Sequence, residues 1–369
     1  MREELGLIVN PIAGLGGRVG LKGTDGPELV REALARGAVP VAPERTRRAL
    51  ARLVQERKET AVAAAPGVLG ADLARAAGLR TSVLAGSGGP ETTAQDTRQA
   101  AAAMAERGVR LLLFAGGDGT ARDIVSVVGD RLPVLGIPTG VKMHSGVFAT
   151  SPEAAGELAA RFLRSPGSRL RLAEVVDVDE EELRRDRVST RLYGVAKVPE
   201  DRNRVQHPKL SSHPGDAALD ALAHELAGEL RGLVVFGPGT TTQKILAALG
   251  VEGSLLGVDV VENGRLIGRD VDERQLLVLL DDKDARAILG VVGGQGFLLG
   301  RGNQQLSPAV LRRIGLDNIE IVAAQDKLVS LDPPRLRVDT GDPALDRDLC
   351  GYRRVRVAPG RSMVIEVST

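Results

Sequence analysis

A glycine-rich pentapeptide carries the residues best suited to phosphate chemistry. It reads Gly116-Gly117-Asp118-Gly119-Thr120 and follows an apolar run, Val109 to Phe114, that predicts a buried strand. The residues after it have helical spacing as far as Val128, so glycines without Cβ would precede a helix whose first amides attract an anion. Thr120 is expected to cap that helix. Strand, motif and helix in this order predict a phosphate-binding loop.

Asp118 is the carboxylate of this loop. Beside a polyphosphate it has two chemical uses: it can accept the proton of an attacking hydroxyl, or it can help to hold Mg²⁺ against phosphate oxygens. A purely structural alternative is a tight turn in which Asp118 bonds the local backbone. The order of the elements favours the catalytic interpretation.

Two further segments offer polar side chains to a nucleotide. Lys142, His144 and Ser145 follow an expected strand, Pro133 to Ile137. Lys142 can neutralise phosphate charge and His144 can donate to phosphate or ribose, although a His that caps its own turn is the alternative. The segment Arg301-Gly302-Asn303-Gln304-Gln305 can present amide groups to the edge of a base, and here the alternative is a hairpin with glycine bulges.

Other nucleotide and hydrolase fingerprints do not match. The glycine-dense loop that begins at Gly14 lacks the spacing G-x-G-x-x-G, and the chain contains neither G-x-x-x-x-G-K-[ST] nor G-x-S-x-G. This argues against a hydride-transferring Rossmann enzyme, a P-loop NTPase and a serine hydrolase with a nucleophile elbow. The loop itself, Gly14 to Gly26, can either close over phosphates or form a flexible surface segment.

Apolar runs alternate with helical segments in the first part of the chain, which predicts a doubly wound parallel sheet. The strands are expected at Leu5 to Asn10, Ala61 to Ala65, Arg80 to Leu84, Val109 to Phe114 and Pro133 to Ile137. Beyond Ser165-Pro166-Gly167-Ser168, short β-like runs such as Leu276 to Leu280 predominate. We therefore expect an α/β domain over residues 1–168 and a mainly β domain over residues 169–369.

Composition restricts the partners and the compartment. Lys plus Arg (49) and Asp plus Glu (48) nearly cancel, so no large positive field favours nucleic acid. No signal peptide or membrane-spanning run is recognisable, and Cys350 is the single cysteine, so no intrachain disulfide can form. These features favour a reducing, cytoplasmic setting without a membrane partner.

The Gly-Gly-Asp-Gly-Thr pentapeptide resembles the signature shared by NAD kinases and diacylglycerol-type lipid kinases. Asn10-Pro11-Ile12-Ala13-Gly14 is similar to the strand and loop that open those enzymes, and Ile137-Pro138-Thr139-Gly140 lies where they place a second phosphate-side loop. Three segments look like the ATP-NAD kinase-like branch, which includes proteins encoded beside acetoin-catabolism genes: Gly20 to Gly26, Gly140 to Phe148 and Gly300 to Gln305. Val338 to Asp342 looks like the Asp-Gly hairpin of the superfamily's β domain.

The resemblance implies a fold and an activity. It implies the α/β domain followed by a mainly β domain, with the active site in the interdomain cleft. The implied reaction transfers the terminal phosphate of ATP, with Mg²⁺, to the 2′-hydroxyl of the adenosine ribose of NAD. Asp118 is the implied base or metal ligand, and nucleotide contacts are implied for Asn10, Gly116, Gly117, Gly119, Thr120, Lys142, His144, Ser145, Glu174 and Asn303. Relatives assemble as homo-oligomers, so a homo-oligomer is expected.

One departure bears on the acceptor. Typical NAD kinases have an Asn-Glu pair at the start of the β domain, whereas this chain has Ala173-Glu174. Two alternatives therefore stay open beside an NAD kinase. The first is a lipid kinase, which predicts an exposed basic or apolar docking helix that the sequence lacks. The second is a nucleotide sensor that binds NADP without turnover.

Overall fold

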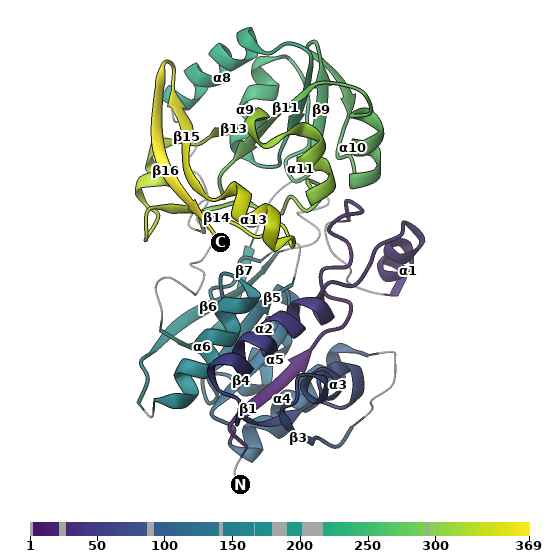
Figure 1. The fold of residues 1–369 in the computed structure, drawn as a ribbon, viewed down its shortest axis with the longest axis vertical. Helices are drawn as coiled ribbons and strands as arrows, with labels where there is room; N and C mark the ends of the chain where they lie inside the picture. The colour runs from purple at the N-terminus through teal and green to yellow at the C-terminus, as the bar shows by residue number, and fades with distance from the viewer. Residues whose placement is uncertain are drawn as a thin grey trace. The chain divides into compact units, whose positions relative to one another are not determined.

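The computed structural model describes residues 3–21, 27–86, 92–139, 143–165, 167–178, 190–200, 217–292, 295–300 and 302–369. The chain divides into two compact units. Among the described residues, the first unit contains 3–15, 27–34 and 39–200, and the second contains 16–21, 35–38 and 217–369. Figure 1 shows the elements of both units along the chain.

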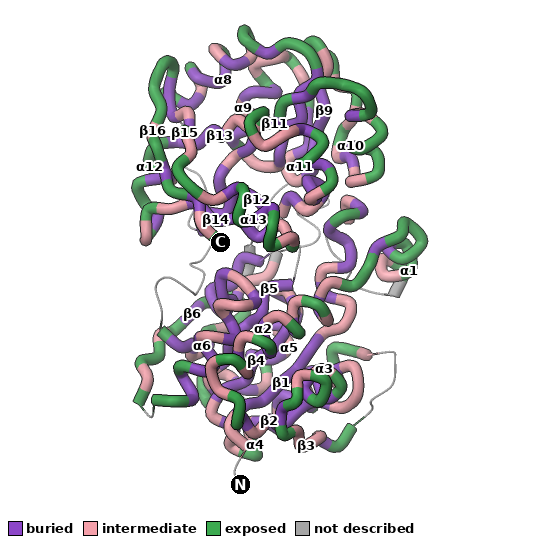
Figure 2. Tube along the Cα trace, in the orientation of Figure 1, coloured by how far each residue is buried: buried purple, intermediate pink, exposed green. Residues whose placement is uncertain are grey.

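The first unit is built on a five-stranded parallel sheet in the order β3-β2-β1-β4-β5. The strands are β1 (Leu5–Val9), β2 (Ala61–Ala64), β3 (Arg80–Val83), β4 (Leu111–Gly116) and β5 (Val134–Pro138). Every residue of β1, β4 and β5 is buried (Figure 2). Continuous apolar strands of this kind are typical of parallel sheets that are covered on both faces. The five expected strands and the doubly wound class are confirmed.

Helices cover this sheet in two packed pairs, α2 with α6 and α4 with α5. The helices of the N-terminal half are α1 (Pro27–Ala35), α2 (Ala42–Glu56), α3 (Ala71–Ala76), α4 (Ala94–Arg107), α5 (Asp118–Val128) and α6 (Pro152–Arg164), with a 3₁₀ turn at Gly67–Leu69. Ser151 caps α6, and Thr93 with Asp96 forms a capping box on α4. The strand order reverses between β1 and β4, and ligands of open α/β sheets bind at the carboxyl ends of the strands at such a switch point.

A two-stranded antiparallel hairpin follows, formed by β6 (Leu170–Val178) and β7 (Thr190–Pro199). It packs on α5 and β5 and groups with the first unit, whereas the sequence predicts a domain boundary at residue 168, before this hairpin. Ala173 and Val175 of β6 and Ala196 and Val198 of β7 are buried in the same core as the parallel sheet. The apolar face of the hairpin is therefore the reason for this grouping.

The second unit contains a nine-stranded mixed sheet in the order β10-β9-β8-β11-β13-β15-β16-β14-β12. Its strands are β8 (Leu233–Phe236), β9 (Asp259–Glu262), β10 (Arg265–Gly268), β11 (Ala285–Gly290), β12 (Phe297–Leu299), β13 (Ile319–Val322), β14 (Arg335–Val338), β15 (Gly351–Ala358) and β16 (Arg361–Ser368). Its helices are α8 (Ala217–Glu229), α9 (Thr240–Ala248), α10 (Glu273–Leu279), α11 (Pro308–Ile314), α12 (Gln325–Val329) and α13 (Pro343–Leu349), with a 3₁₀ turn at Leu316–Asn318. The mostly sheet second domain is confirmed.

Two local predictions in this unit are wrong. Leu276 to Leu280 was expected to be a strand, but most of it lies in α10, which begins with a capping box between Asp272 and Gln275. The segment Val338 to Asp342 was expected to be a hairpin. It instead ends β14 and leads into α13, because the Asp342 carboxylate accepts from the amides of Ala344 and Leu345. In both places a side-chain cap decides the local structure.

A short stretch of the N-terminal region belongs to the second unit. Residues 16–21 lie there, and the Arg18 carbonyl accepts from the amide of Glu273 at the start of α10. The chain therefore leaves the first unit after β1, contributes to the second, and returns. None of the helices in the described residues is long and apolar enough to span a bilayer.

Candidate active site

Asp118 lies at the first position of α5, and Gly117 alone separates it from the end of β4. Its side chain is almost completely buried, with 4% exposed. The backbone amide of His144 donates to Oδ2 (2.6 Å) and that of Ser145 donates to Oδ1 (3.0 Å). Each carboxylate oxygen thus has one backbone donor, and Asp118 joins the start of α5 to the loop after β5.

Burial raises the pKa of Asp118 to about 7. Desolvation is the largest cause because it disfavours the charged carboxylate. Hydrogen bonds from Ser145 and His144 act in the opposite direction, and the negative charge of Asp177 raises the pKa further. A carboxylate with a pKa near 7 is well matched to general-base catalysis at neutral pH.

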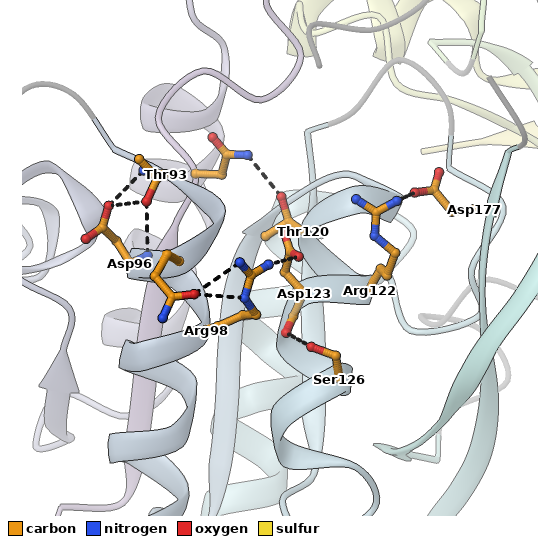
Figure 3. Close-up of polar contacts among 10 residues, drawn as sticks. Thr93, Asp96, Arg98, Thr120, Arg122, Asp123, Ser126 and Asp177 are labelled. Carbon is orange, nitrogen blue, oxygen red and sulfur yellow. Dashed lines mark hydrogen bonds and ion pairs between the residues drawn. The ribbon is translucent and has the colours of Figure 1, made fainter. Parts of the chain in front are cut away.

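Asn10 and Thr120 connect the two strand ends at the switch point. Nδ2 of Asn10, just beyond β1, donates to Oγ1 of Thr120 (3.1 Å), and Oδ1 of Asn10 accepts from the amide of Ile12. Thr120 was expected to cap α5, but the capping position belongs to Gly117 and Thr120 lies inside the first turn. Figure 3 shows Thr120 among the polar side chains of α5. Its hydroxyl therefore ties the helix to the β1 loop.

The two glycines before Asp118 have different environments. A Cβ at Gly116 would lie 2.4 Å from Cβ of Thr120, so glycine is required there for the close approach of strand and helix. Gly117 has φ −112° and ψ −165°, extended angles that any residue adopts. The backbone conformation therefore does not explain why this position is a glycine. The role predicted for Gly117 is still to leave room for the phosphate of a ligand. Gly119 follows within the first turn of α5.

Ser145 is held by backbone groups on β6. Its Oγ donates to the carbonyl of Val176 (2.9 Å) and accepts from the amide of the same residue (3.1 Å). Next to it, the amide of Gly146 donates to the carbonyl of Glu174, and Arg171 donates to the carbonyl of Gly146. These bonds fix the segment whose amides hold Asp118.

Thr139 adds a buried hydroxyl at the end of β5. Its side chain is 3% exposed, and Oγ1 has no hydrogen-bond partner among the described residues. The Thr139 amide donates to the carbonyl of Gly116, and Gly14 lies so close that a Cβ there would be 2.0 Å from the Thr139 carbonyl oxygen. Gly14 also has φ +79°, which only glycine adopts easily. A buried hydroxyl without a partner suits a ligand oxygen.

The other residues predicted from sequence fall in three groups. Lys142, residues 22–26 of the glycine-dense loop, and Arg301 lie outside the described residues. His144 is buried beside Asp118, and Glu174 is exposed on β6. Asn303 belongs to the second unit, where Oδ1 accepts from Gly300 and Nδ2 donates to the carbonyl of Leu298, so its amide closes its own turn. Their predicted nucleotide contacts stay predictions.

Sequence reasoning did not find three side chains beside Asp118. Arg122 lies one helical turn further along α5 and pairs with Asp177 of β6 (2.7 Å; Figure 3). The Arg122 guanidinium carbon also lies 5.4 Å from the ring centroid of Tyr193, on β7. The sequence shows that Asp118 and Arg122 are four residues apart on a helix. It does not show the partners of Arg122, because Asp177 and Tyr193 lie on strands later in the chain.

The residues are compatible with Mg²⁺ that is held mainly by phosphates. Within the described ranges, no three His, Cys, Asp or Glu side chains are grouped to hold a metal ion. Each oxygen of Asp118 accepts one backbone hydrogen bond, and a carboxylate oxygen has two lone pairs. Mg²⁺ usually takes one or two carboxylates together with water and substrate phosphates. Asp118 alone can supply the protein's share of such a site.

Taken together, the first unit has the architecture of an α/β nucleotide-binding kinase domain: a parallel sheet, a glycine-rich loop at its switch point and a buried carboxylate on that loop. Comparison with known families supports this class. The ATP-NAD kinase N-terminal domain matches residues 5–166, and the ATP-NAD kinase C-terminal domain matches residues 232–367. The chain belongs to the ATP-NAD kinase family. A search of curated proteins found no match.

Proposed function

We propose that this protein is a Mg²⁺-dependent kinase that transfers the terminal phosphoryl group of ATP to the 2′-hydroxyl of the adenosine ribose of NAD, giving NADP. The observation that carries the proposal is Asp118, buried at the switch point with a pKa raised to about 7 and held by two backbone amides. Family membership supports the substrates ATP and NAD.

In this proposal Asp118 accepts the proton of the attacking hydroxyl. The freed oxygen forms a bond to the terminal phosphorus of ATP, the bond to the bridging oxygen breaks, and ADP leaves. The amides of His144 and Ser145 hold the Asp118 carboxylate in place during proton transfer. Such a reaction depends on positioning and on charge neutralisation rather than on a covalent intermediate.

The phosphates are assigned to the loop before α5. The first amides of this helix attract negative charge, and Oγ1 of Thr139 offers a further donor. Mg²⁺, when bound, neutralises charge on the phosphate oxygens, and Asp118 is the residue that would hold it. Asn10 and Thr120 keep the loop after β1 next to this helix.

The test is a panel of acceptors with the purified 369-residue protein. Protein, Mg²⁺ and ATP, or polyphosphate in a parallel series, are incubated with NAD, NADH, diacylglycerol or a sugar. Mass spectrometry then identifies which acceptor has gained phosphate. We expect NADP from NAD. Phosphorylation of a different acceptor alone would overturn the NAD assignment, and tight binding of NADP without any turnover would identify a nucleotide sensor.

A further inference from the structure

Exposed aromatic rings are rare in this protein. Of the seven aromatic side chains, all of which the structure describes, the five Phe rings are buried, and Tyr352 lies in the second unit. Tyr193 is therefore the one exposed aromatic ring among the described residues of the first unit, with 43% exposed. Aromatic rings offer a flat apolar face, and exposed ones are frequently contact points for ligands.

An irregularity in the hairpin presents Tyr193. Val175 pairs with Gly194 and the next residue, Val176, pairs with Leu192, so Tyr193 is an extra residue on β7. Bulges of this kind redirect a side chain and are common beside active sites. The bulge lies at Val176, the residue whose backbone holds the Ser145 hydroxyl. The redirected ring and the support of the Asp118 site thus share one position on the hairpin.

Arg122 links the ring to the candidate active site. It stands four residues after Asp118 on α5, so their Cβ atoms are neighbours on one face of the helix, about 6 Å apart. Its guanidinium carbon lies 5.4 Å from the Tyr193 ring centroid and its Nη1 lies 2.7 Å from Asp177. The ion pair with Asp177 helps to hold the guanidinium over one face of the ring (Figure 3 shows Arg122 and Asp177 directed toward each other).

We propose that Tyr193 and Arg122 form a stacking subsite for the purine base of a nucleotide whose phosphates or ribose lie at the Asp118 loop. The proposal rests on the proposed function for the presence of that nucleotide. A ring and a guanidinium are the two side-chain planes on which bases stack, and such stacking tolerates any base with a flat face. Leu192 and Val195, near Tyr193 in the sequence of β7, are also partly exposed.

The chain offers a direct optical test because it contains no tryptophan and only two tyrosines. Tyr352→Phe, on β15 of the second unit, leaves Tyr193 as the sole tyrosine. Its emission is followed while ADP, NAD, nicotinamide mononucleotide or inorganic tripolyphosphate is added, with free tyrosine amide as the inner-filter control. We expect ADP or NAD to change the emission, and tripolyphosphate, which has no base, to leave it unchanged.

Comparison of the titrations with different ligands also identifies which nucleotide supplies the stacked base. A response to ADP alone assigns the adenine of the phosphoryl donor, and a response to NAD alone assigns the adenine of the acceptor. If calorimetry shows that ADP and NAD bind while the Tyr193 emission stays constant, the ring does not contact a base and the proposal is wrong.

Variants of the ring supply an independent measurement. Tyr193→Ala is expected to weaken binding of the responding nucleotide roughly tenfold or more and to leave tripolyphosphate binding unchanged, whereas Tyr193→Phe keeps the stacking face and close to the original affinity. Tyr352→Ala is the matched control. If Tyr193→Ala loses affinity equally for nucleotide and for tripolyphosphate, the substitution has damaged the fold and the stacking subsite is wrong. The subsite is also wrong if Tyr193→Ala keeps its nucleotide affinity but changes its sedimentation coefficient, because Tyr193 would then be a contact between two copies of the protein.

The outcome is separable from that of the proposed function. If the protein forms NADP but the Tyr193 emission does not respond to nucleotides, the stacking subsite is wrong and the kinase assignment stands. A Tyr193 response to nucleotides without any phosphoryl transfer would keep the subsite and remove the kinase assignment.

Discussion

Replacing Asp118 by Asn is expected to make the stability of the protein less dependent on pH while it removes the proton acceptor. The folded-state pKa is about 7, against 3.8 for an unperturbed Asp. Below pH 4 the carboxyl is protonated in both the folded and the unfolded chain. As pH rises toward 7, the unfolded chain releases this proton and the folded chain keeps it, so the free energy of unfolding falls with pH.

The size of the effect follows from the pKa difference. Roughly three pH units at about 1.4 kcal/mol each give about 4 kcal/mol, an upper bound for this buried group. Asn stays neutral at every pH, but its Nδ2 cannot accept the backbone hydrogen bond that one Asp118 oxygen accepts. Asp118→Asn is therefore expected to gain up to about 4 kcal/mol relative to the wild type between pH 4 and pH 8, offset by the cost of the lost bond, which is the same at every pH. The difference in stability between the two proteins should therefore move in favour of Asp118→Asn as pH rises from 4 to 8.

Urea unfolding at pH 5 and pH 8, without nucleotide and with a chelator, measures the difference. Asp130→Asn is the matched control, because the Asp130 side chain is 66% exposed and the same change there should leave the pH dependence of stability as it is. An Asp118→Asn protein whose stability relative to the wild type is the same at both pH values would refute the reasoning.

The same variant tests the chemistry. If Asp118 is the base, turnover of Asp118→Asn should fall on the order of 10² or more while NAD binding changes little. In the wild type, kcat/KM should rise with pH and level off above about 7, because the carboxyl must be unprotonated to accept a proton. Raising Mg²⁺ would partly restore a lost metal ligand but not a lost base. Near-native turnover would leave the pentapeptide as a structural turn.

Three further substitutions separate packing from ligand contact. Gly116→Ala is expected to destabilise the fold by about 1–3 kcal/mol in urea unfolding, because its Cβ would overlap Thr120. Gly117→Val should unfold as the wild type does but bind nucleotide more weakly in calorimetry; unchanged affinity would mean that the loop does not touch phosphate. Ser145→Ala should lose about 1–2 kcal/mol of stability and some turnover, because the hydrogen bonds between the Ser145 hydroxyl and the Val176 backbone are lost. Ser145→Thr keeps a hydroxyl and should restore part of both.

The sequence was sufficient to predict the strands of the first sheet, because they are unbroken apolar runs. It also predicted Asp118 as the candidate carboxylate, because Asp118 stands where a strand passes into a helix. It was not sufficient where short-range capping competes with hydrophobicity. Leu276 to Leu280 is as apolar as a strand, yet the Asp272 and Gln275 cap begins a helix there. That cap was visible in the sequence as an Asp three residues before a Gln.

The contacts of the candidate site were predicted less well because they join distant segments. Asn10 and Thr120 are 110 residues apart, and the role of Thr120 as a link rather than a cap depends on that contact. Tyr193 lies on β7, and the register shift that makes it the extra residue has no local sequence signal. Asn303 shows the opposite case, a polar residue in a promising segment whose amide is used by its own turn.

The early detour of the chain through the second unit constrains how the protein can be made and recombined. Residues 16–21 leave the ribosome long before α10 is synthesised. The Arg18 carbonyl therefore cannot accept the hydrogen bond of the Glu273 amide until most of the chain has been made. A fragment that begins at residue 232, where the C-terminal family match starts, would lack this piece. The two units are thus not interchangeable, because a chimera joined by a single crossover between them would take residues 16–21 and its C-terminal half from different parents.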